Sequence, residues 1–191
     1  WILRYFAPQK AKEGEVYTPR EVIRLLIEIL DPKPGESVYD PASASNGMLI
    51  ASYAHVKHHY SADAAEQLFL FGQEANAKTL AFGRMNMYIH DIRNVKLAYG
   101  DTLLYPKFKD GEAIQQFDVV VANPPWNQDM YDENQLKKGE FWKQRFPYGF
   151  PNRQSADWAW IQHMLASAKS SNGRVGVVID NGCLFRGGKE S

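Results

Sequence analysis

The chain has 191 residues, of which 45% are hydrophobic and 23% charged, and its 22 basic and 22 acidic side chains give a formal net charge of zero. This composition is typical of one globular domain, residues 1–191, and excludes collagen-like, coiled-coil and disordered classes. No apolar run approaches the roughly 20 residues of a membrane span, so we expect a soluble protein with no membrane partner. A single cysteine, Cys183, excludes an internal disulfide framework and favours the cytoplasm. Zero net charge indicates that any binding to nucleic acid is local or needs another chain.

Both ends of the sequence predict a fragment of a longer protein. The chain starts at Trp1 instead of Met and stops at Ser191, directly after an expected strand and turn. The first residues show no charged-then-apolar leader, so we expect no signal peptide.

Short strand-like apolar runs alternate with longer helical ones along the chain. Residues 21–30 are predicted to form a helix, with Thr18 as its cap and Pro19 in the favoured first-turn position. Residues 127–154 show no periodicity and are expected to form a long loop. The other expected elements are strands at 37–40, 68–73, 95–98, 117–122 and 174–179, and helices at 47–58, 76–90 and 156–170.

Strands that alternate with helices predict an α/β fold with a doubly wound, mostly parallel sheet and helices on both faces. Ligands bind at the carboxyl ends of the strands in such a sheet. The polar residues that end the strands should therefore converge on one crevice. These residues are Asp40, Glu74, Asp101 and Asn123.

Each of the first three strand ends allows two interpretations. The small-residue turn after Asp40 lets a ligand approach the backbone closely, or it is an ordinary strand-to-helix turn. Glu74 is placed to accept from the hydroxyls of a ribose, or it is a solvated carboxylate at a helix start. Asp101 accepts from the amino group of a bound purine, or it caps a turn.

The fourth strand end carries the sequence Asn123-Pro124-Pro125-Trp126. Its prolines fix φ and remove backbone donors, so they hold the Asn123 side chain and nearby carbonyls in a fixed array. An amide oxygen, a main-chain carbonyl and an aromatic face suit a planar base that is held by its amino group. A proline-stiffened loop with a core tryptophan is the alternative.

This tetrapeptide resembles the Asn/Asp-Pro-Pro-aromatic motif of methyltransferases that modify exocyclic amino groups with S-adenosylmethionine. Nearly the whole chain is similar, in the same order, to the modification (M) subunit of type I restriction-modification systems. The segments that carry the resemblance are Gly14-Glu15-Val16-Tyr17-Thr18-Pro19-Arg20-Glu21, Tyr39-Asp40-Pro41-Ala42, Gly72-Gln73-Glu74, Met85-Asn86 and Gly182-Cys183-Leu184-Phe185-Arg186-Gly187-Gly188. The resemblance implies a Rossmann-like class I methyltransferase fold.

The resemblance also implies roles for individual residues. Residues that match the catalytic tetrad are Asn123, Pro124, Pro125 and Trp126. Residues that match cofactor-binding positions are Tyr17, Thr18 and Pro19 near the methionine part, Asp40, Ala42, Ser43 and Gly47 in the first motif, Glu74 at the ribose and Asp101 near the adenine.

The implied reaction is methyl transfer from S-adenosylmethionine to the exocyclic amino group of adenine in double-stranded DNA. The adenine is flipped out of the duplex and stacks on Trp126, while the Asn123 side-chain oxygen and the Pro124 carbonyl accept hydrogens from its amino group. Neither a metal nor a nucleophilic side chain is required. The family works with a separate specificity subunit and a restriction subunit, which agrees with the neutral charge of this chain.

The first motif departs from the family pattern Asp-Pro-Ala-Cys-Gly-Ser/Thr-Gly-Gly, because Ala44 and Asn46 stand where the family has glycines. A positive φ at Ala44 would cost on the order of 1 kcal/mol. Two alternatives stay open. One is a degenerate subunit that binds DNA or partners without catalysis, which this departure supports. The other is a methyltransferase that acts on RNA or protein glutamine, since the tetrad also suits planar amides.

Two further clusters also have two interpretations each. Basic and aromatic side chains interleave in residues 127–154, which suits contact with a distorted DNA strand or a loop whose aromatics pack on the domain. His55, His58 and His59 cluster at a helix end, where solvated or dipole-complementing histidines are favoured over a metal site.

Overall fold

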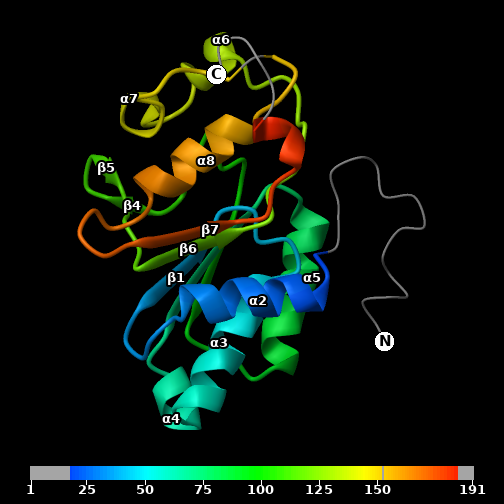
Figure 1. The fold of residues 1–191 in the computed structure, drawn as a ribbon, viewed down its shortest axis with the longest axis vertical. Helices are drawn as coiled ribbons and strands as arrows, with labels where there is room; N and C mark the ends of the chain where they lie inside the picture. Colours follow the sequence, from blue (N-terminus) through cyan, green and yellow to red (C-terminus); the bar gives the residue numbers. More distant parts are fainter. Residues whose placement is uncertain (1–17, 152, 185–191) are drawn as a thin grey trace.

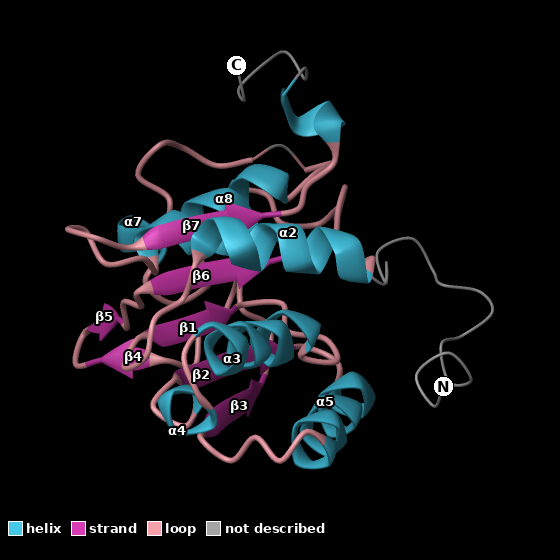
Figure 2. Cartoon of the chain, turned by 60° about the horizontal axis from the view of Figure 1, so that its bottom comes forward, coloured by secondary structure: helices cyan, strands magenta, loops and turns pink. Residues whose placement is uncertain are grey.

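The computed structural model describes residues 18–151 and 153–184. A central sheet of five parallel strands runs through it in the order β3-β2-β1-β6-β7 (Figures 1 and 2). The strands are β1 (Ser37–Asp40), β2 (Phe69–Glu74), β3 (Val95–Tyr99), β6 (Val119–Ala122) and β7 (Arg174–Val177). A small antiparallel hairpin joins β4 (Lys109–Asp110) to β5 (Ala113–Ile114).

Most helices lie between these strands in sequence, while α2 precedes β1 and the 3-10 turn η1 follows β7. They are α2 (Arg20–Leu30), α3 (Gly47–His59), α4 (Ala62–Ala65), α5 (Ala77–Ile89), α6 (Glu133–Leu136), α7 (Trp142–Arg145), α8 (Asp157–Ala166) and the 3-10 turn η1 (Asn181–Leu184). Within residues 18–151 and 153–184, every helix is too short or too polar to cross a membrane.

Successive strand residues point to opposite faces of the sheet, and both faces are covered. Helices α2, α3 and α5 cover one face and α8 the other (Figure 2). Val38 packs with side chains of α2, α3 and α5, whereas Tyr39 packs with Met164 of α8. All residues of β6 are buried, as expected for a central parallel strand. The predicted doubly wound α/β fold is confirmed.

The described residues of the segment 127–154 include two short helices where a long loop was expected. These helices are α6 and α7, and Leu136 and Phe146 pack with Trp160 in a separate hydrophobic cluster. The Arg145 side chain is fully buried and donates hydrogen bonds to the carbonyls of Thr102, Leu103 and Glu140 at 2.6–3.1 Å. The packing interpretation is therefore confirmed for these side chains, and Arg145 does not face a DNA strand.

The start of α2 differs from the prediction. The helix begins at Arg20 with Pro19 in the N-cap position, and the Pro19 side chain makes no capping hydrogen bond. The prediction that Thr18 caps this helix is wrong, because the Thr18 hydroxyl instead accepts a hydrogen bond from Asn123 at the edge of the sheet.

Candidate active site

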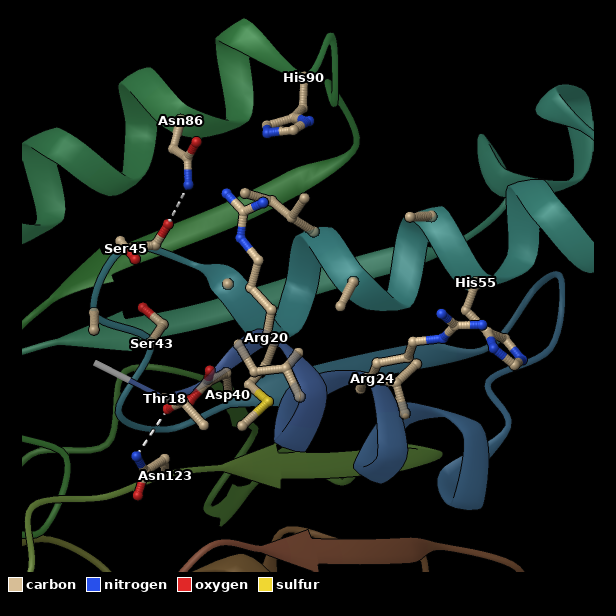
Figure 3. Close-up of a pocket in the computed structure, with 18 of the residues that line it drawn as sticks. Thr18, Arg20, Arg24, Asp40, Ser43, Ser45, His55, Asn86, His90 and Asn123 are labelled. Carbon is tan, nitrogen blue, oxygen red and sulfur yellow. Dashed lines mark hydrogen bonds between the residues drawn. The ribbon is translucent and has the colours of Figure 1, made fainter. Parts of the chain in front are cut away.

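The strand order changes direction between β1 and β6, which places a crevice at the carboxyl ends of these two strands. A cavity of about 640 Å³ opens there and extends between α2 and α3 (Figure 3). Six of the predicted site residues line it, namely Thr18, Asp40, Ala42, Ser43, Gly47 and Asn123. The sheet topology thus brings the first motif and the tetrad asparagine to one cavity.

The other predicted residues have different positions. Tyr17 lies outside the described residues, as does the segment 185–188 that contributed to the resemblance. The cavity lining does not include Pro19, Glu74, Asp101, Pro124, Pro125 and Trp126. Of the four strand ends expected to converge on one crevice, Asp40 and Asn123 therefore share the cavity lining, while Glu74 and Asp101 are not part of it.

Asp40 is the last residue of β1 and is 2% exposed. Its Oδ1 accepts a hydrogen bond from the Ala42 backbone amide at 3.0 Å. Burial raises the pKa of this carboxyl to about 8, and the nearby charge of Glu74 adds to the effect. The carboxylate at the cavity wall is thus poorly solvated, so a positively charged ligand would stabilise its ionised form.

The turn after Asp40 adopts left-handed backbone conformations at two residues that are not glycine. Ala44 has a φ of 44° and Asn46 a φ of 65°. The Ala44 amide donates to Glu74 Oε2 at 3.0 Å, and Asn86 Nδ2 of α5 donates to the Ser45 carbonyl at 2.9 Å (Figure 3). These contacts hold the turn in its strained shape.

Helix α5 approaches this turn so closely that the helix requires a glycine, Gly83, at the point of contact. A Cβ at Gly83 would lie 2.6 Å from Asn46 Nδ2 and 2.9 Å from the Ala44 carbonyl oxygen. The Asn46 side chain is buried against this helix, and neither its amide nitrogen nor its amide oxygen has a hydrogen-bond partner among the described residues.

Glu74 and Asp101 both bond to the protein itself. The two Glu74 oxygens accept hydrogen bonds from the amides of Ala44 and Asn76, at 3.0 and 2.7 Å. Asp101 Oδ1 accepts from the Leu104 amide at 3.1 Å, and its Oδ2 accepts from the Tyr131 hydroxyl at 2.7 Å. Asp101 therefore caps a turn, as one of its two interpretations predicted, and it also holds the segment that follows the tetrad.

The Asn123 side chain is oriented by a residue from the start of α2. Its Nδ2 donates to Thr18 Oγ1 at 2.8 Å (Figure 3). Its Oδ1 is buried and has no hydrogen-bond partner among the described residues. A buried amide oxygen without a partner is unfavourable, and a donor group of a ligand would satisfy it.

Trp126 is half-buried, and its Nε1 donates to the Val178 carbonyl at 3.1 Å, just after β7. This hydrogen bond fixes the plane of the indole ring. Pro124, between Asn123 and Trp126, is buried.

Three residues that support the site carried only weak sequence signals. Asn86 stood out solely through the resemblance, although it lines the cavity and binds the turn. Gln73, fully buried, donates to the carbonyls of Gly100 and Tyr105. Arg20 also lines the cavity, and nothing in the local sequence pattern distinguishes it from a solvated helix residue.

The parallel sheet, the small-residue turn after β1 and the Asn-Pro-Pro-Trp segment after β6 define a class I methyltransferase domain. A family model described as N-6 DNA Methylase matches residues 1–191, and the chain belongs to this family.

Similar proteins agree with this assignment. The chain is 46% identical to the type I restriction enzyme MjaVIII methylase subunit of Methanocaldococcus jannaschii, over 100% of the chain and 32% of that subunit. The crystal structure of a type I restriction-modification system methyltransferase subunit from Streptococcus thermophilus matches with a TM-score of 0.79 and 28% identity, covering 94% of this chain and 38% of that one. The structure of the EcoKI M protein matches with a TM-score of 0.71 and 26% identity, covering 95% of this chain and 37% of that one.

These comparisons confirm the resemblance to type I modification subunits. The chain spans about a third of the length of the curated relatives that it matches.

Proposed function

We propose that this chain is the catalytic domain of a type I modification subunit, which transfers a methyl group from S-adenosylmethionine to the exocyclic amino group of adenine in double-stranded DNA. The observation that carries the proposal is the state of Asn123. Its amide nitrogen is held by Thr18, whereas its buried oxygen has no hydrogen-bond partner among the described residues. That oxygen is positioned to accept a hydrogen from a substrate amino group.

The cavity beside Asn123 fits the cofactor. Its volume of about 640 Å³ lies within the usual range of small-molecule sites, roughly 300–1,000 Å³. When bound, S-adenosylmethionine supplies an electrophilic methyl group on a positively charged sulfur. Thr18, Ala42, Ser43 and Gly47 would hold it together with Asp40, whose poorly solvated carboxyl gains from a cation. Ser43 Oγ is buried and lacks a partner among residues 18–151 and 153–184, so it is a further contact point.

Cofactor roles for Tyr17, Pro19, Glu74 and Asp101 belong to the same proposal. Glu74 reaches the back of the turn through the Ala44 amide, so it supports the turn whether or not it also contacts a ribose.

The chemistry depends on positioning and hydrogen bonding. Asn123 Oδ1 and the Pro124 carbonyl accept the two hydrogens of the adenine amino group, which draws the nitrogen lone pair out of conjugation with the ring. Pro125 keeps this segment rigid, and Trp126 stacks on the flipped base. Loss of one hydrogen bond of this kind typically costs about 3 kcal/mol of barrier, on the order of a hundredfold in rate.

The chain does not attract DNA through its overall charge, since 22 basic and 22 acidic side chains cancel. We therefore propose that a separate specificity subunit supplies sequence recognition, that a restriction subunit joins the same complex, and that the complex works in the cytoplasm, where the DNA is. The similarity to type I restriction enzyme methylase subunits supports this assignment.

The test is transfer of labelled methyl groups from S-adenosylmethionine to duplex DNA by the protein in complex with its specificity subunit. We expect Asn123→Ala to lower the transfer rate by about a hundredfold, with a much smaller effect on cofactor affinity. Asn134→Ala, at an exposed asparagine of α6, is the matched control and should retain full activity.

Other outcomes distinguish the alternatives. Cofactor binding without transfer to DNA, but with transfer to tRNA or to a protein glutamine, would replace DNA as the substrate. Absence of cofactor binding by the wild-type complex would identify a degenerate subunit.

A further inference from the structure

A cluster of ligand-type side chains lies at the far end of the same cavity, where the last turn of α2 faces α3. Glu28 comes from α2, and His55 and His59 come from successive turns of α3. Their ligand atoms all lie within 4.8 Å of one another. The two helices run side by side in both ribbon views, and Figure 3 shows His55 pointing into the space between them.

The distances within this cluster suit a metal ion. His55 Nδ1 lies 3.6 Å from Glu28 Oε1, and His59 Nε2 lies 3.4 Å from Glu28 Oε2. Zinc bonds of about 2.0–2.1 Å in tetrahedral geometry separate neighbouring ligand atoms by roughly 3.3 Å. The separation between His55 and Glu28 is too long for a hydrogen bond. The two histidines approach different oxygens of the Glu28 carboxylate at separations near this edge, so both carboxylate oxygens face the space between the rings.

His55 supplies the second, independent observation. The histidines of this cluster were expected to be solvated or to complement the helix dipole, and the His55 side chain is only 4% exposed. Its Nε2 is 3.0 Å from Asp31 Oδ1, whereas its Nδ1 is buried and has no hydrogen-bond partner in the described part of the chain. If Nε2 carries the ring proton and donates it to Asp31, the Nδ1 lone pair faces the Glu28 carboxylate. Two acceptors that face each other are stabilised by a cation between them.

Asp31 completes a pattern found around bound metals, in which a carboxylate accepts a hydrogen bond from the outer nitrogen of a histidine ligand. Asp31 itself ends α2 with a φ of 44°, and it also pairs with Lys33. The pattern therefore includes an inner set of three donors and an outer carboxylate that sets the tautomer of the buried ring.

We propose that Glu28, His55 and His59 bind a divalent transition-metal ion, zinc according to the nitrogen and carboxylate donor set, with the remaining coordination position open to water. The ion joins α2 to α3. Because α2 begins next to Thr18, the same ion would steady the helix whose start orients Asn123. Arg24 lies one turn before Glu28 and lines the same cavity, so its positive charge opposes the ion.

Metal titration tests the proposal. The protein in its natural length, purified without a histidine tag and stripped with a chelator, is titrated with Zn²⁺ and with Co²⁺, whose visible absorption reports the coordination geometry. We expect one ion per chain, a tetrahedral cobalt spectrum and a melting temperature that rises by a few degrees with excess Zn²⁺.

Substitutions at exposed positions should leave the fold intact, so a change in metal affinity can be assigned to the lost ligand. Glu28→Gln and His59→Ala should each weaken binding on the order of a hundredfold, while the matched control His58→Ala, an exposed neighbour outside the trio, should bind like wild type. Asp31→Gly fits the left-handed conformation and should weaken binding about ten- to a hundredfold. Arg24→Ala should tighten metal binding, because it removes a positive charge close to the ion.

Absence of stoichiometric binding at micromolar metal, or equal loss in His58→Ala and His59→Ala, would overturn the proposal. The readout is metal binding, so it does not depend on the methyl-transfer activity.

Discussion

Thr18 Oγ1 and Asn123 Nδ2 lie 2.8 Å apart, although the two residues are 105 positions apart in the sequence. The hydrogen bond connects the segment before α2 to the end of β6. It fixes the orientation of the Asn123 amide, since the nitrogen is held and the oxygen has no hydrogen-bond partner among the described residues. A residue from outside the sheet thus determines the hydrogen-bonding polarity of the proposed base site.

Replacing Thr18 by valine tests this relationship. Thr18→Val removes the hydroxyl at nearly constant volume, so the Asn123 amide is free to rotate, and we expect the rate constant of methyl transfer to fall on the order of ten- to a hundredfold. Thr18→Ser keeps the acceptor and should retain most of the activity. Single-turnover transfer with labelled cofactor measures the rate. Equal rates in Thr18→Val and wild type would show that the hydrogen bond has no positioning role.

Ala44 is a site where a substitution should stabilise the protein. Its φ of 44° costs an alanine on the order of 1 kcal/mol, and glycine adopts this conformation without that cost. We expect Ala44→Gly to raise the free energy of unfolding by a few tenths to about 1 kcal/mol, because the greater freedom of glycine in the unfolded chain offsets part of the gain. Urea denaturation measures this. A lower stability would mean that the Ala44 methyl group makes compensating contacts.

Gly83 should tolerate no side chain. The added Cβ of Gly83→Ala would meet the Asn46 amide at 2.6 Å and the Ala44 carbonyl at 2.9 Å, so we expect a loss of about 1–3 kcal/mol in stability. The double variant Asn46→Gly/Gly83→Ala removes the first clash and keeps the second, so it should recover only part of the loss. A double-mutant cycle by urea denaturation gives the coupling free energy, and additive effects would contradict the direct contact.

Asp40 predicts a specific dependence of stability on pH. Its pKa rises from an ordinary 3.8 to about 8 on folding, because burial disfavours the charged form. The folded state therefore binds a proton more tightly, and the stability from this group is fully present below pH 4 and lost as the pH rises through 8. We expect the difference in stability between Asp40→Asn and wild type to shift in favour of the variant between pH 5 and pH 9. Parallel pH profiles would argue against a raised pKa.

For Asp118 we expect the opposite dependence of stability on pH. Burial alone would raise its pKa, but hydrogen bonds from Lys169 and from the Ser37 amide and hydroxyl lower it below 3.8. Its stability contribution is therefore present above pH 4 and lost as the pH falls through the lowered pKa.

Lys169→Met should thus cost about 1 kcal/mol at pH 7, since the lysine is partly exposed, and much less at pH 3. Urea denaturation at both pH values measures the difference, with Lys138→Met at an exposed lysine as the control. An equal loss at both pH values would assign the effect to packing.

The central elements could be predicted from sequence because their local patterns agree with their tertiary environment. Val119-Val120-Val121 is β-branched and buried on both faces, and the expected strands and helices around it begin and end within a few residues of the observed ones. The hairpin of β4 and β5 and the helix α4 were missed, since each has too few residues to show a period.

The site residues that lie at the carboxyl ends of the strands were predictable from the sheet topology. Long-range hydrogen bonds between side chains were less predictable. The switch point between β1 and β6 places Asp40 and Asn123 at one cavity, as the topology requires. The hydroxyl of Thr18 was expected at the helix start but bonds across the sheet instead, because Pro19 occupies the N-cap position. Long-range pairs of this kind leave no periodic signal in the sequence.

The buried guanidinium of Arg145 has a thermodynamic consequence for the proposed DNA complex. It binds the segment after the tetrad to the carbonyls of Thr102 and Leu103, and it also bonds to the Glu140 carbonyl within that segment. This segment therefore has little backbone freedom left to lose on association. The heat-capacity change of DNA binding should then be smaller than that of a reaction in which a segment folds on binding. It should scale only with the surface buried between protein and DNA.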